Sequence, residues 1–477
     1  MKRIMIIGNS PLPTDSEKMR PAAGLRTYQF LRPLVEPHAQ RVGNDGLAFS
    51  GAKKTPFKIS LVTIAMPECY EKEPEEKEMR QSSDFSHLRL SKNDPNLIKK
   101  IQKIHDEFHP DAIISVNTYP SYVAAQLESR APLWADLNGW AMAEAQAQAY
   151  KVGSDNYLGH YYEMERTVLE RADKISTVSV PQKFAVLGEL AMLGRLNEAT
   201  FGYKFAYSIA NGTEWFEGEK VKKKEVEERN KKLFGKLPED AFVVLWLGGY
   251  NTWVDEITLF KGVDEAMSKC KNLYFVSTGG GIEGLDNGTF KKFKDRVDKS
   301  KYKNRFKFLG WVDTADIPYI YKKAMVGLNV DRKCTETYTG ARNRINEMMK
   351  FGLPVITTLG SEISREVEKI EAGVAVKSGK SDELSEAIIR MYKDLKNRHG
   401  YKLKQYAENG KKYVNTECNY EFLTRPLTNW LDNPRPAPDR GVRVGFGKKS
   451  AIRSAFQYLK DNGFKKFFKK VMQRIKR

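Results

Sequence analysis

The part of the sequence with the clearest chemical potential is a short helical segment that begins after Gly340 and ends near Phe351. Asn343 and Glu347 stand four residues apart, and Arg344 is three residues from Glu347, so the three side chains are neighbours on a helix surface. The free N–H groups at the start of a helix attract phosphate, and a carboxylate one to two turns further along can accept hydrogen bonds from two ribose hydroxyls. The segment therefore predicts a nucleotide site with Asn343, Arg344 and Glu347 as ligands; the alternative is an ordinary surface Arg–Glu pair on a core helix.

Two glycine turns follow predicted strands in the same half of the chain. Gly249 follows the strand 242–247, from which a long loop leads to Lys261, and Gly280 lies in the turn after the strand 273–277. Glycine lets the backbone approach a ligand closely, and a lysine can meet a diphosphate. We therefore expect Gly249, Lys261 and Gly280 to line the same site, although glycine turns also end many strands that bind nothing.

The first half of the chain offers polar side chains in loops after strands. Asn117 follows one predicted strand, and Asp136 and Asn138 follow the next. Ligands of open parallel sheets bind outside the carboxyl ends of the strands, so these side chains are candidates for the second substrate. Asp136 is the predicted catalytic residue, either positioning that substrate or acting as a base; the alternative is an N-cap for the helix predicted at 141–150.

Short apolar runs alternate with amphipathic helical patterns through the first 400 residues. Such runs are typical of parallel sheets that are covered on both faces, and there are about six in each half. The predicted strands are 4–7, 59–64, 112–116, 132–135, 174–178, 206–209, 242–247, 273–277, 306–309, 325–330, 354–357 and 373–376. The expected fold class is α/β, with two Rossmann-like domains that face each other across a cleft.

Charge and proline mark the predicted boundaries. A highly charged segment at 217–240 indicates a helix or linker between the halves, with the boundary between Gly235 and Asp240. The predicted domains are therefore 1–235 and 236–400, followed by closing helices at 401–432, a proline-rich linker at 433–447 and a tail at 448–477. The charged run 68–80 is expected to be a surface loop.

The tail is strongly basic and amphipathic. Residues 441–477 contain twelve Lys or Arg and one Asp, which is +11 of the net +20 of the chain. Phe464, Phe468 and Met472 belong to an apolar series at helical spacing, with lysines between them, and Asn462-Gly463 predicts a break. Attachment to an anionic membrane surface is the favoured interpretation. The alternatives are docking on the protein or a partner, and a disordered or nucleic-acid-binding tail.

Several other classes of protein are disfavoured. The four cysteines have no paired spacing, which argues against a disulfide framework and fits a reducing compartment. No apolar run approaches the roughly 18 residues of a membrane span, and the short apolar run at the N-terminus is unlike a signal peptide. His105 and His109 have the spacing of a helical zinc pair, but Pro110 follows at once and no third ligand is evident. No Asp-x-Asp motif is present. We therefore expect neither a metal nor a cofactor.

The segments 247–262, 275–281, 308–312 (FLGWV) and 342–358 (RNRINEMMKFGLPVITT) resemble the donor domain of GT-B-fold retaining glycosyltransferases, close to glycosyltransferase family 4. The first half resembles the family more loosely, and the resemblance covers roughly residues 1 to 400. It implies the GT-B fold, with residues 1–235 on the acceptor side and residues 236–400 binding a nucleotide sugar.

The resemblance also assigns roles to residues. Glu347 corresponds to the glutamate that binds the donor ribose, and Lys261 to the lysine that binds the diphosphate. A second glutamate usually stands eight positions before the first, and that position here is Thr339, with Glu336 out of register. Because the usual glycine-rich loop is replaced by TGARN, Arg342 or Arg344 is a further candidate for the diphosphate.

These observations predict a retaining, metal-independent glycosyltransferase in cell-surface polysaccharide biosynthesis. Its expected partners are a nucleotide-sugar donor, a glycan or lipid-linked acceptor approached by Asn117 and Asn138, and an anionic membrane at the cytoplasmic face of the cell membrane. An inactive sugar-nucleotide-binding scaffold subunit and a sugar-nucleotide epimerase are the alternatives. A nucleic-acid partner is not expected, because most of the excess charge lies in the tail and no reading motif is present.

Overall fold

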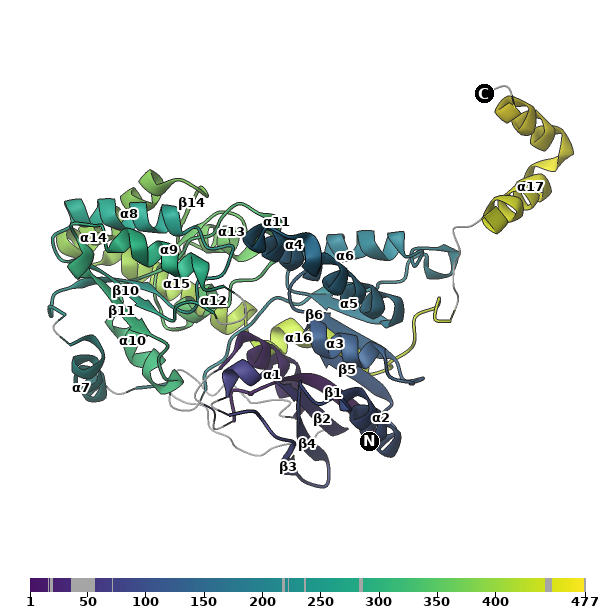
Figure 1. Ribbon diagram of the computed structural model, residues 1–477, viewed down its shortest axis with the longest axis horizontal. Helices are drawn as coiled ribbons and strands as arrows, with labels where there is room; N and C mark the ends of the chain where they lie inside the picture. The colour runs from purple at the N-terminus through teal and green to yellow at the C-terminus, as the bar shows by residue number, and fades with distance from the viewer. Residues whose placement is uncertain are drawn as a thin grey trace.

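The computed structural model describes residues 1–15, 17, 20–35, 56–70, 72–216, 219–221, 223–235, 237–282, 286–441 and 448–475. Two α/β domains lie side by side, each built on a central sheet with helices packed on it, and the C-terminal helix lies beyond them (Figure 1). The expected architecture of two Rossmann-like domains is confirmed.

The first domain has an eight-stranded sheet in the order β3-β4-β2-β1-β5-β6-β7-β8. Every neighbouring pair is parallel except β3 with β4. The strands are β1 (Lys2–Ser10), β2 (Phe57–Ala65), β3 (Lys77–Gln81), β4 (Phe85–Ser91), β5 (Ala112–Val116), β6 (Leu133–Leu137), β7 (Lys174–Thr177) and β8 (Ala206–Ser208). All six strands predicted for this half are present.

The sequence analysis missed β3 and β4. The run 68–80, expected to be a loop, contributes its last residues to β3, which pairs antiparallel with β4 at the edge of the sheet. Charged side chains such as Lys77, Glu78 and Arg80 protect an exposed edge from pairing with another chain. The same charges hide the strand from a search for apolar runs.

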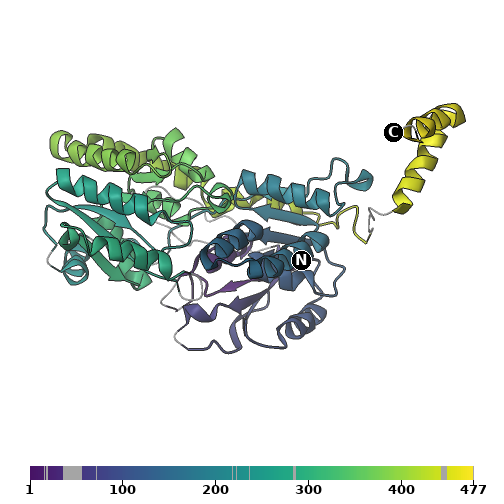
Figure 2. The ribbon, with the colours of Figure 1, turned by 45° about the horizontal axis from the view of Figure 1, so that its top comes forward.

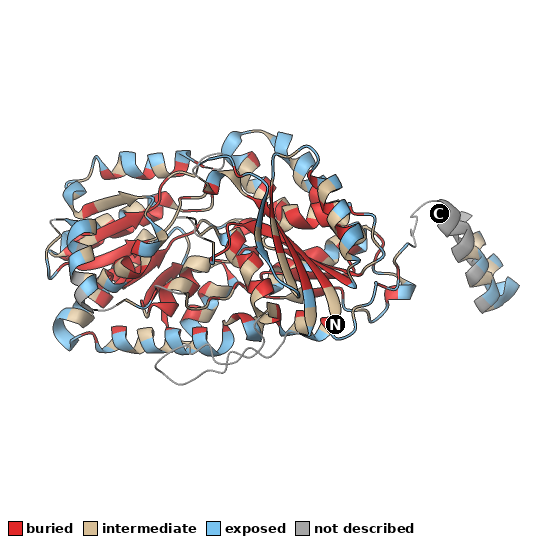
Figure 3. Ribbon diagram, turned by 90° about the horizontal axis from the view of Figure 1, so that it is seen from below, coloured by how far each residue is buried: buried red, intermediate tan, exposed pale blue. Residues whose placement is uncertain are grey.

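The central strand β1 explains why these runs are apolar throughout. Successive side chains of a strand point to opposite faces of the sheet. Ile4 and Ile6 lie in one buried cluster, and Met5 and Ile7 lie in another on the opposite face. Both faces are buried, as the red strands in Figure 3 show. The helices of this domain are α1 (Ala22–Val35), α2 (Leu97–Phe108), α3 (Thr118–Ala125), α4 (Ala141–Val152), α5 (Leu158–Arg171) and α6 (Val180–Met192).

The second domain has a six-stranded, wholly parallel sheet in the order β11-β10-β9-β12-β13-β14. Its strands are β9 (Phe242–Trp246), β10 (Leu273–Thr278), β11 (Phe306–Gly310), β12 (Val326–Asn329), β13 (Val355–Thr358) and β14 (Gly373–Val376). The six predicted strands are all confirmed. The helices are α8 (Glu256–Lys269), α9 (Gly288–Val297), α10 (Ile317–Lys323), α11 (Thr335–Thr339), α12 (Asn343–Lys350), α13 (Glu362–Lys369), α14 (Ser381–Arg398) and α15 (Tyr401–Glu417).

The chain crosses between the domains earlier than predicted. Helix α7 (Lys223–Phe234) packs against α10 and β11, and Phe234 lies in the core of the second domain. The crossing therefore falls between β8 and α7, not between Gly235 and Asp240. The sequence analysis expected a helix or a linker in the charged segment 217–240, and α7 confirms the helix.

After the second domain, the chain returns to the first domain. Helix α16 (Tyr420–Leu431) places Leu427 and Leu431 in the cluster that contains Phe30 and Trp134. Beyond it, Arg195 forms a bidentate buried ion pair with Asp439, at 2.8 and 2.9 Å. Residues 433–441 therefore bind to the first domain, which corrects the expectation of a free spacer; residues 442–447 of the predicted linker lie outside the described residues.

Helix α17 (Lys448–Ile475) is the basic tail. It has a non-helical break at Gly463, with φ 73° and ψ 162°, as predicted. Phe464, Phe468 and Met472 are exposed, and the helix lies apart from both domains in two views (Figures 1 and 2). Among the helices that the structure describes, none is long and apolar enough to cross a bilayer.

Candidate active site

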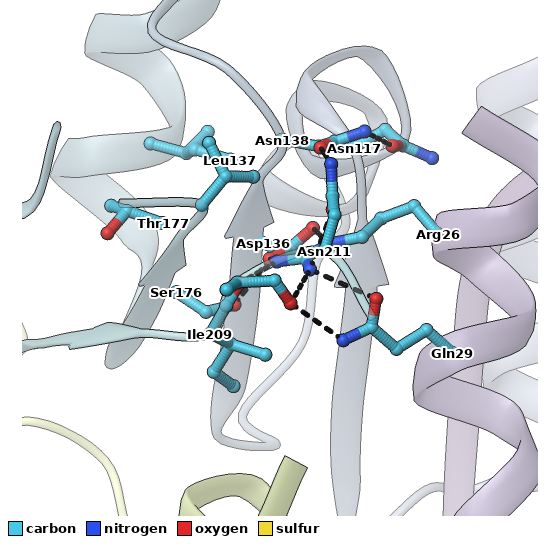
Figure 4. A network of polar contacts seen from close by, with 12 residues as sticks. Arg26, Gln29, Asn117, Asp136, Leu137, Asn138, Ser176, Thr177, Ile209 and Asn211 are labelled. Atoms are coloured by element: carbon cyan, nitrogen blue, oxygen red, sulfur yellow. Dashed lines mark hydrogen bonds and ion pairs between the residues drawn. The ribbon is translucent and has the colours of Figure 1, made fainter. Parts of the chain in front are cut away.

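A chain of hydrogen-bonded amides crosses the edge of the first sheet where its strands end (Figure 4). Asn138 donates to Asn117 at 2.9 Å, and Asn211 donates to Asn138 at 3.3 Å. Asn211 in turn accepts from Arg26 at 3.0 Å. Asn117 has a φ of 77°, a conformation that is uncommon outside glycine and that asparagine tolerates better than most residues. The network joins the loops after β5 and β6 to the segment that crosses between the domains.

Asp136 lies beneath this network and is fully buried. Its two carboxylate oxygens accept from Arg26 at 2.7 and 3.0 Å, and Ser176 donates to one of them at 2.6 Å. Because its carboxylate is fully buried and paired with a buried arginine, Asp136 cannot face a substrate, which corrects its prediction as the catalytic residue. It does not cap helix α4 either, since the residue at the N-cap is Trp140. Asp136 holds Arg26, which in turn holds the crossing segment.

The crossing segment binds helix α12 of the second domain. Asn346 donates to the carbonyl of Asn211 at 2.6 Å, and Lys350 donates to the carbonyl of Glu214 at 3.1 Å. Thr213 donates to the Glu347 carboxylate. The polar network of the first domain therefore continues without a gap into the helix that carries the predicted ribose ligand.

Glu347 is half-buried where the two domains meet. Its second carboxylate oxygen lies 2.8 Å from Lys350, and the buried Lys350 also pairs with Glu219 at 3.0 Å. The lysine orients the Glu347 carboxylate, and its second ion pair, with Glu219, means that Lys350 does not depend on Glu347 alone. Burial raises the pKa of Glu219, while Lys350 opposes that effect.

The two arginines beside this helix have different environments. Arg342 is buried and pairs with Asp331 at 2.6 Å and with Glu336 at 2.7 Å. It is therefore held within the protein, which excludes it as the free cation for a diphosphate. Arg344 stacks its guanidinium 4.2 Å from the centre of the Trp246 ring and donates to the carbonyl of Gly249 at 3.1 Å.

Arg344 and Asn343 each have a polar atom without a hydrogen-bond partner in the part of the chain that the structure describes. Its Nη1 has no hydrogen-bond partner among the described residues, and neither has the Oδ1 of Asn343. Gly249 and Gly280 lie nearby, because the amide of Tyr250 donates to the carbonyl of Gly280 at 3.0 Å. A side chain at Gly279, which has a φ of 70°, would come within 2.5 Å of the Gly248 carbonyl, so the two turns interlock only as glycines. Arg344, Gly249 and Gly280 therefore lie close together at the ends of β9 and β10.

Lys261 is not part of this group. It is exposed in the second turn of α8, and within the described part of the chain no hydrogen bond or ion pair joins it to Arg344, Gly249 or Glu347. The adjacent Gly262 packs against Leu384, whose side chain lies 2.6 Å from the position of a Cβ atom. Gly262 therefore serves the contact between α8 and α14, and Arg344 is the cation that lies beside Gly249.

One polar side chain at the cleft was missed by the sequence analysis. Glu144 lies in the first turn of α4 and is half-buried, with a carboxylate oxygen 2.4 Å from where a Cβ of Gly139 would stand. Burial raises its pKa to about 8, and Glu336 raises it further, while Arg342 lowers it. The only signal in the sequence is an acidic residue in the first turn of a helix, which is too common to single it out.

The two domains touch directly beside Glu144. Helix α4 contacts α11, and Ser179 at the N-cap of α6 donates to the carbonyl of Thr339 at 2.6 Å. The amide of Val180 donates to Glu362 at 2.8 Å. The hydroxyl of Thr339 itself donates to the carbonyl of Thr335 at 3.0 Å. The structure is therefore closed around the site, with Thr339 at the contact.

Comparisons with known proteins support the two-domain fold. Residues 241–394 match the family model described as glycosyl transferases group 1. No curated sequence matches the chain. Three solved structures share the fold over nearly the whole length. The sucrose-phosphate synthase of Thermosynechococcus elongatus has 17% identity and a TM-score of 0.61, over 91% of this chain and 98% of that chain.

The alignments with two other structures include the whole of those chains. HepE of Anabaena, solved in complex with UDP-glucose, has 14% identity and a TM-score of 0.61, over 91% of this chain and 100% of that chain. WaaG, a glycosyltransferase involved in lipopolysaccharide biosynthesis, has 14% identity and a TM-score of 0.55, with the same coverage. The fold of the chain is therefore the GT-B fold, and its second domain is the part that matches the glycosyl transferases group 1. The predicted GT-B fold is confirmed.

Proposed function

We propose that the protein transfers a sugar from a nucleotide-sugar donor to a glycan or lipid-linked acceptor in cell-surface polysaccharide biosynthesis, with retention of configuration and without a metal. The observation that carries this proposal is the α12 site, where a carboxylate held by Lys350 lies one helical turn from an arginine with an unpartnered nitrogen. The first suits a ribose and the second suits a diphosphate. HepE, a similar structure, was solved with UDP-glucose, and WaaG acts in lipopolysaccharide biosynthesis.

The proposed reaction breaks the bond between the anomeric carbon and the distal phosphate oxygen of the donor. A bond forms between that carbon and an acceptor oxygen, the acceptor hydroxyl gives its proton to water, and the nucleoside diphosphate leaves with the additional negative charge. Arg344 stabilises this charge in a preorganised, partly dry site. Asn117 and Asn138 fix the loops on which the acceptor rests, and Gly249 and Gly280 allow the backbone to approach the donor phosphates.

A thermal-shift screen with UDP, GDP, ADP and dTDP and the corresponding glucose nucleotides tests the proposal. At least one should raise the melting temperature, since a ligand that binds only the folded state stabilises it by mass action. Stabilisation by none of them would contradict the proposal. Binding of a nucleotide sugar without transfer or hydrolysis would favour a second candidate, a non-catalytic sugar-nucleotide-binding subunit. The helix-bonded hydroxyl of Thr339, at a position where the family has a carboxylate, favours that candidate.

Replacing Arg344 by alanine is expected to weaken binding of the nucleoside diphosphate by about 10- to 100-fold. The reason is the loss of a charge-assisted hydrogen bond, which contributes about 1.5–3 kcal/mol. The dissociation constant by titration calorimetry is the measurement. Arg365→Ala is a matched control, because Arg365 also donates to a glycine carbonyl, that of Gly360, but is exposed on α13. Equal affinities of the Arg344 variant and the wild type would contradict the assignment.

We further propose that α17 holds the protein on an anionic membrane at the cytoplasmic face, near a lipid-linked acceptor. Exposed Phe464 and Phe468 stack at 5.8 Å, and the adjacent Lys465, Lys466 and Lys469 are exposed too. Aromatic insertion and basic side chains each favour an anionic lipid surface, by about 1 kcal/mol per basic residue. A helix docked on either domain would bury these phenylalanines, and a nucleic-acid contact does not require them.

Replacing both Phe464 and Phe468 by alanine is expected to lower binding of the full chain to phosphatidylglycerol-containing vesicles by about tenfold or more. Two large apolar side chains, each of which contributes about 1.5–3 kcal/mol when buried, would no longer insert. Co-sedimentation measures the bound fraction, and wild-type binding should weaken in high salt. Phe201→Ala, at a phenylalanine that is 95% exposed on the first domain, is the control. Unchanged sedimentation of the double variant would exclude membrane insertion.

A further inference from the structure

A carboxyl group of the first domain stands without a partner at the closed contact between the domains. The carboxyl group of Glu144 has no hydrogen-bond or ion-pair partner among the residues that the structure describes, although the side chain is half-buried. The neighbouring Glu165 of α5 is buried and accepts a hydrogen bond from the amide of Met142. Because burial disfavours a polar group that lacks a partner, a bound ligand would gain by supplying the partner that the Glu144 carboxyl group lacks.

The position of Glu144 relates it to both substrates. It lies one turn beyond Asn138 and Gly139, the loop that follows β6. From the second domain, α11 packs against α4, and Glu336 and Arg342 face Glu144 closely enough to affect its charge. Tyr161 and Glu165 of α5 face it from behind. Glu144 therefore lies between the acceptor-side loop and the loop that leads into the α12 site.

We propose that Glu144 binds, as a neutral carboxyl group, a hydroxyl group of the sugar that is held between the two domains. This inference rests on the proposed function. A neutral carboxyl has one donor and spare acceptors, the same complement as a hydroxyl. A charged carboxylate in this place would repel the donor diphosphate and Glu336. Glu336 cannot replace it, because both of its oxygens accept from Arg342, at 3.0 and 2.7 Å.

The electrostatic environment supports the neutral form. Burial raises the pKa of Glu144 from 4.5 to about 8, and Glu336 acts in the same direction. Because the pKa is raised, the group holds its proton at neutral pH and loses it as the pH rises through about 8. Arg342 opposes this shift but is occupied by Asp331 and Glu336. The binding-competent form is therefore present below about pH 8 and is lost above it.

The test compares Glu144→Ala and Glu144→Gln with the wild type. Calorimetry gives the affinities for UDP, GDP, ADP and dTDP, and the rate of hydrolysis of the four glucose nucleotides gives turnover. Glu144→Ala should bind the preferred nucleoside diphosphate within about twofold of the wild type but hydrolyse its glucose derivative about tenfold more slowly or worse, for the loss of one hydrogen bond to the sugar. Glu144→Gln should stay within about threefold of the wild type at pH 7. Glu421→Ala, at an exposed glutamate in the first turn of α16, is the control.

A pH series separates this role from a structural one. Wild-type turnover should fall as the pH rises through about 8, whereas Glu144→Gln, which has no proton to lose, should stay flat. Wild-type turnover by Glu144→Ala, parallel loss of nucleotide affinity and turnover, or a glutamine variant as slow as the alanine variant at every pH would each overturn the inference. If the wild-type protein binds none of the four nucleotides, the proposed function itself fails, and the premise of the inference fails with it.

Discussion

Replacing Glu347 by glutamine is expected to lower kcat/KM for the nucleotide sugar by about 100-fold or more. In the proposed complex the carboxylate accepts from two ribose hydroxyls, and hydrogen bonds to a charged group contribute about 1.5–3 kcal/mol each. The loss of about 3 kcal/mol or more corresponds to at least two decades. Steady-state kinetics with the donor identified by the thermal-shift screen is the measurement.

The Glu347 variant should remain folded, and this separates its role in binding from one in stability. Lys350 keeps its ion pair with Glu219 at 3.0 Å and its bond to the Glu214 carbonyl. Glu366→Gln is a matched control, since Glu366 also pairs with a lysine three residues later, at 3.0 Å, but that lysine, Lys369, is exposed where Lys350 is buried. A Glu347 variant with wild-type kinetics would refute the ribose assignment.

Replacing Asp136 by alanine is expected to destabilise the first domain by about 3–5 kcal/mol. The substitution leaves Arg26, which is 2% exposed, as an uncompensated buried charge. It also frees the guanidinium that holds the carbonyls of Ile209 and Ala210, so the crossing segment loses its anchor. Urea unfolding measures the change in the free energy of unfolding.

Two control variants test whether the loss of stability comes from the unpaired buried charge. Glu163→Ala removes an exposed partner of Arg166 and should cost about 1 kcal/mol or less. The double replacement Arg26→Met with Asp136→Leu should recover part of the stability, because no buried charge is left alone. If Asp136→Ala kept its stability and lost only turnover, Asp136 would be the catalytic group that the sequence analysis predicted, and the structural role would be wrong.

The candidate ligands that lie close together in the structure are those whose relation is set by spacing along one element. Glu347 and Arg344 share a single helix, and helix geometry alone makes them neighbours. The prediction that Lys261 lies beside Gly249 was wrong because the position of Lys261 depends on where α8 begins. Asp255, six residues earlier, caps the helix and so sets that position. The prediction of Arg342 as a cation for the diphosphate was wrong because its ion-pair partners, Asp331 and Glu336, come from other elements.

Apolar periodicity in the sequence was sufficient to predict two parallel α/β domains, twelve of the fourteen strands, the helical tail and its break at Gly463. These features follow from local patterns, since burial on both faces of a strand requires consecutive apolar residues. Only the tertiary structure decided which polar groups meet. It paired Asp136 with Arg26, placed α7 in the second domain and brought Glu144 opposite Glu336 across the cleft. Such contacts join residues from 95 to 244 positions apart in the chain, and no local pattern encodes them. Their energies depend on burial and on the charges that folding gathers around each group.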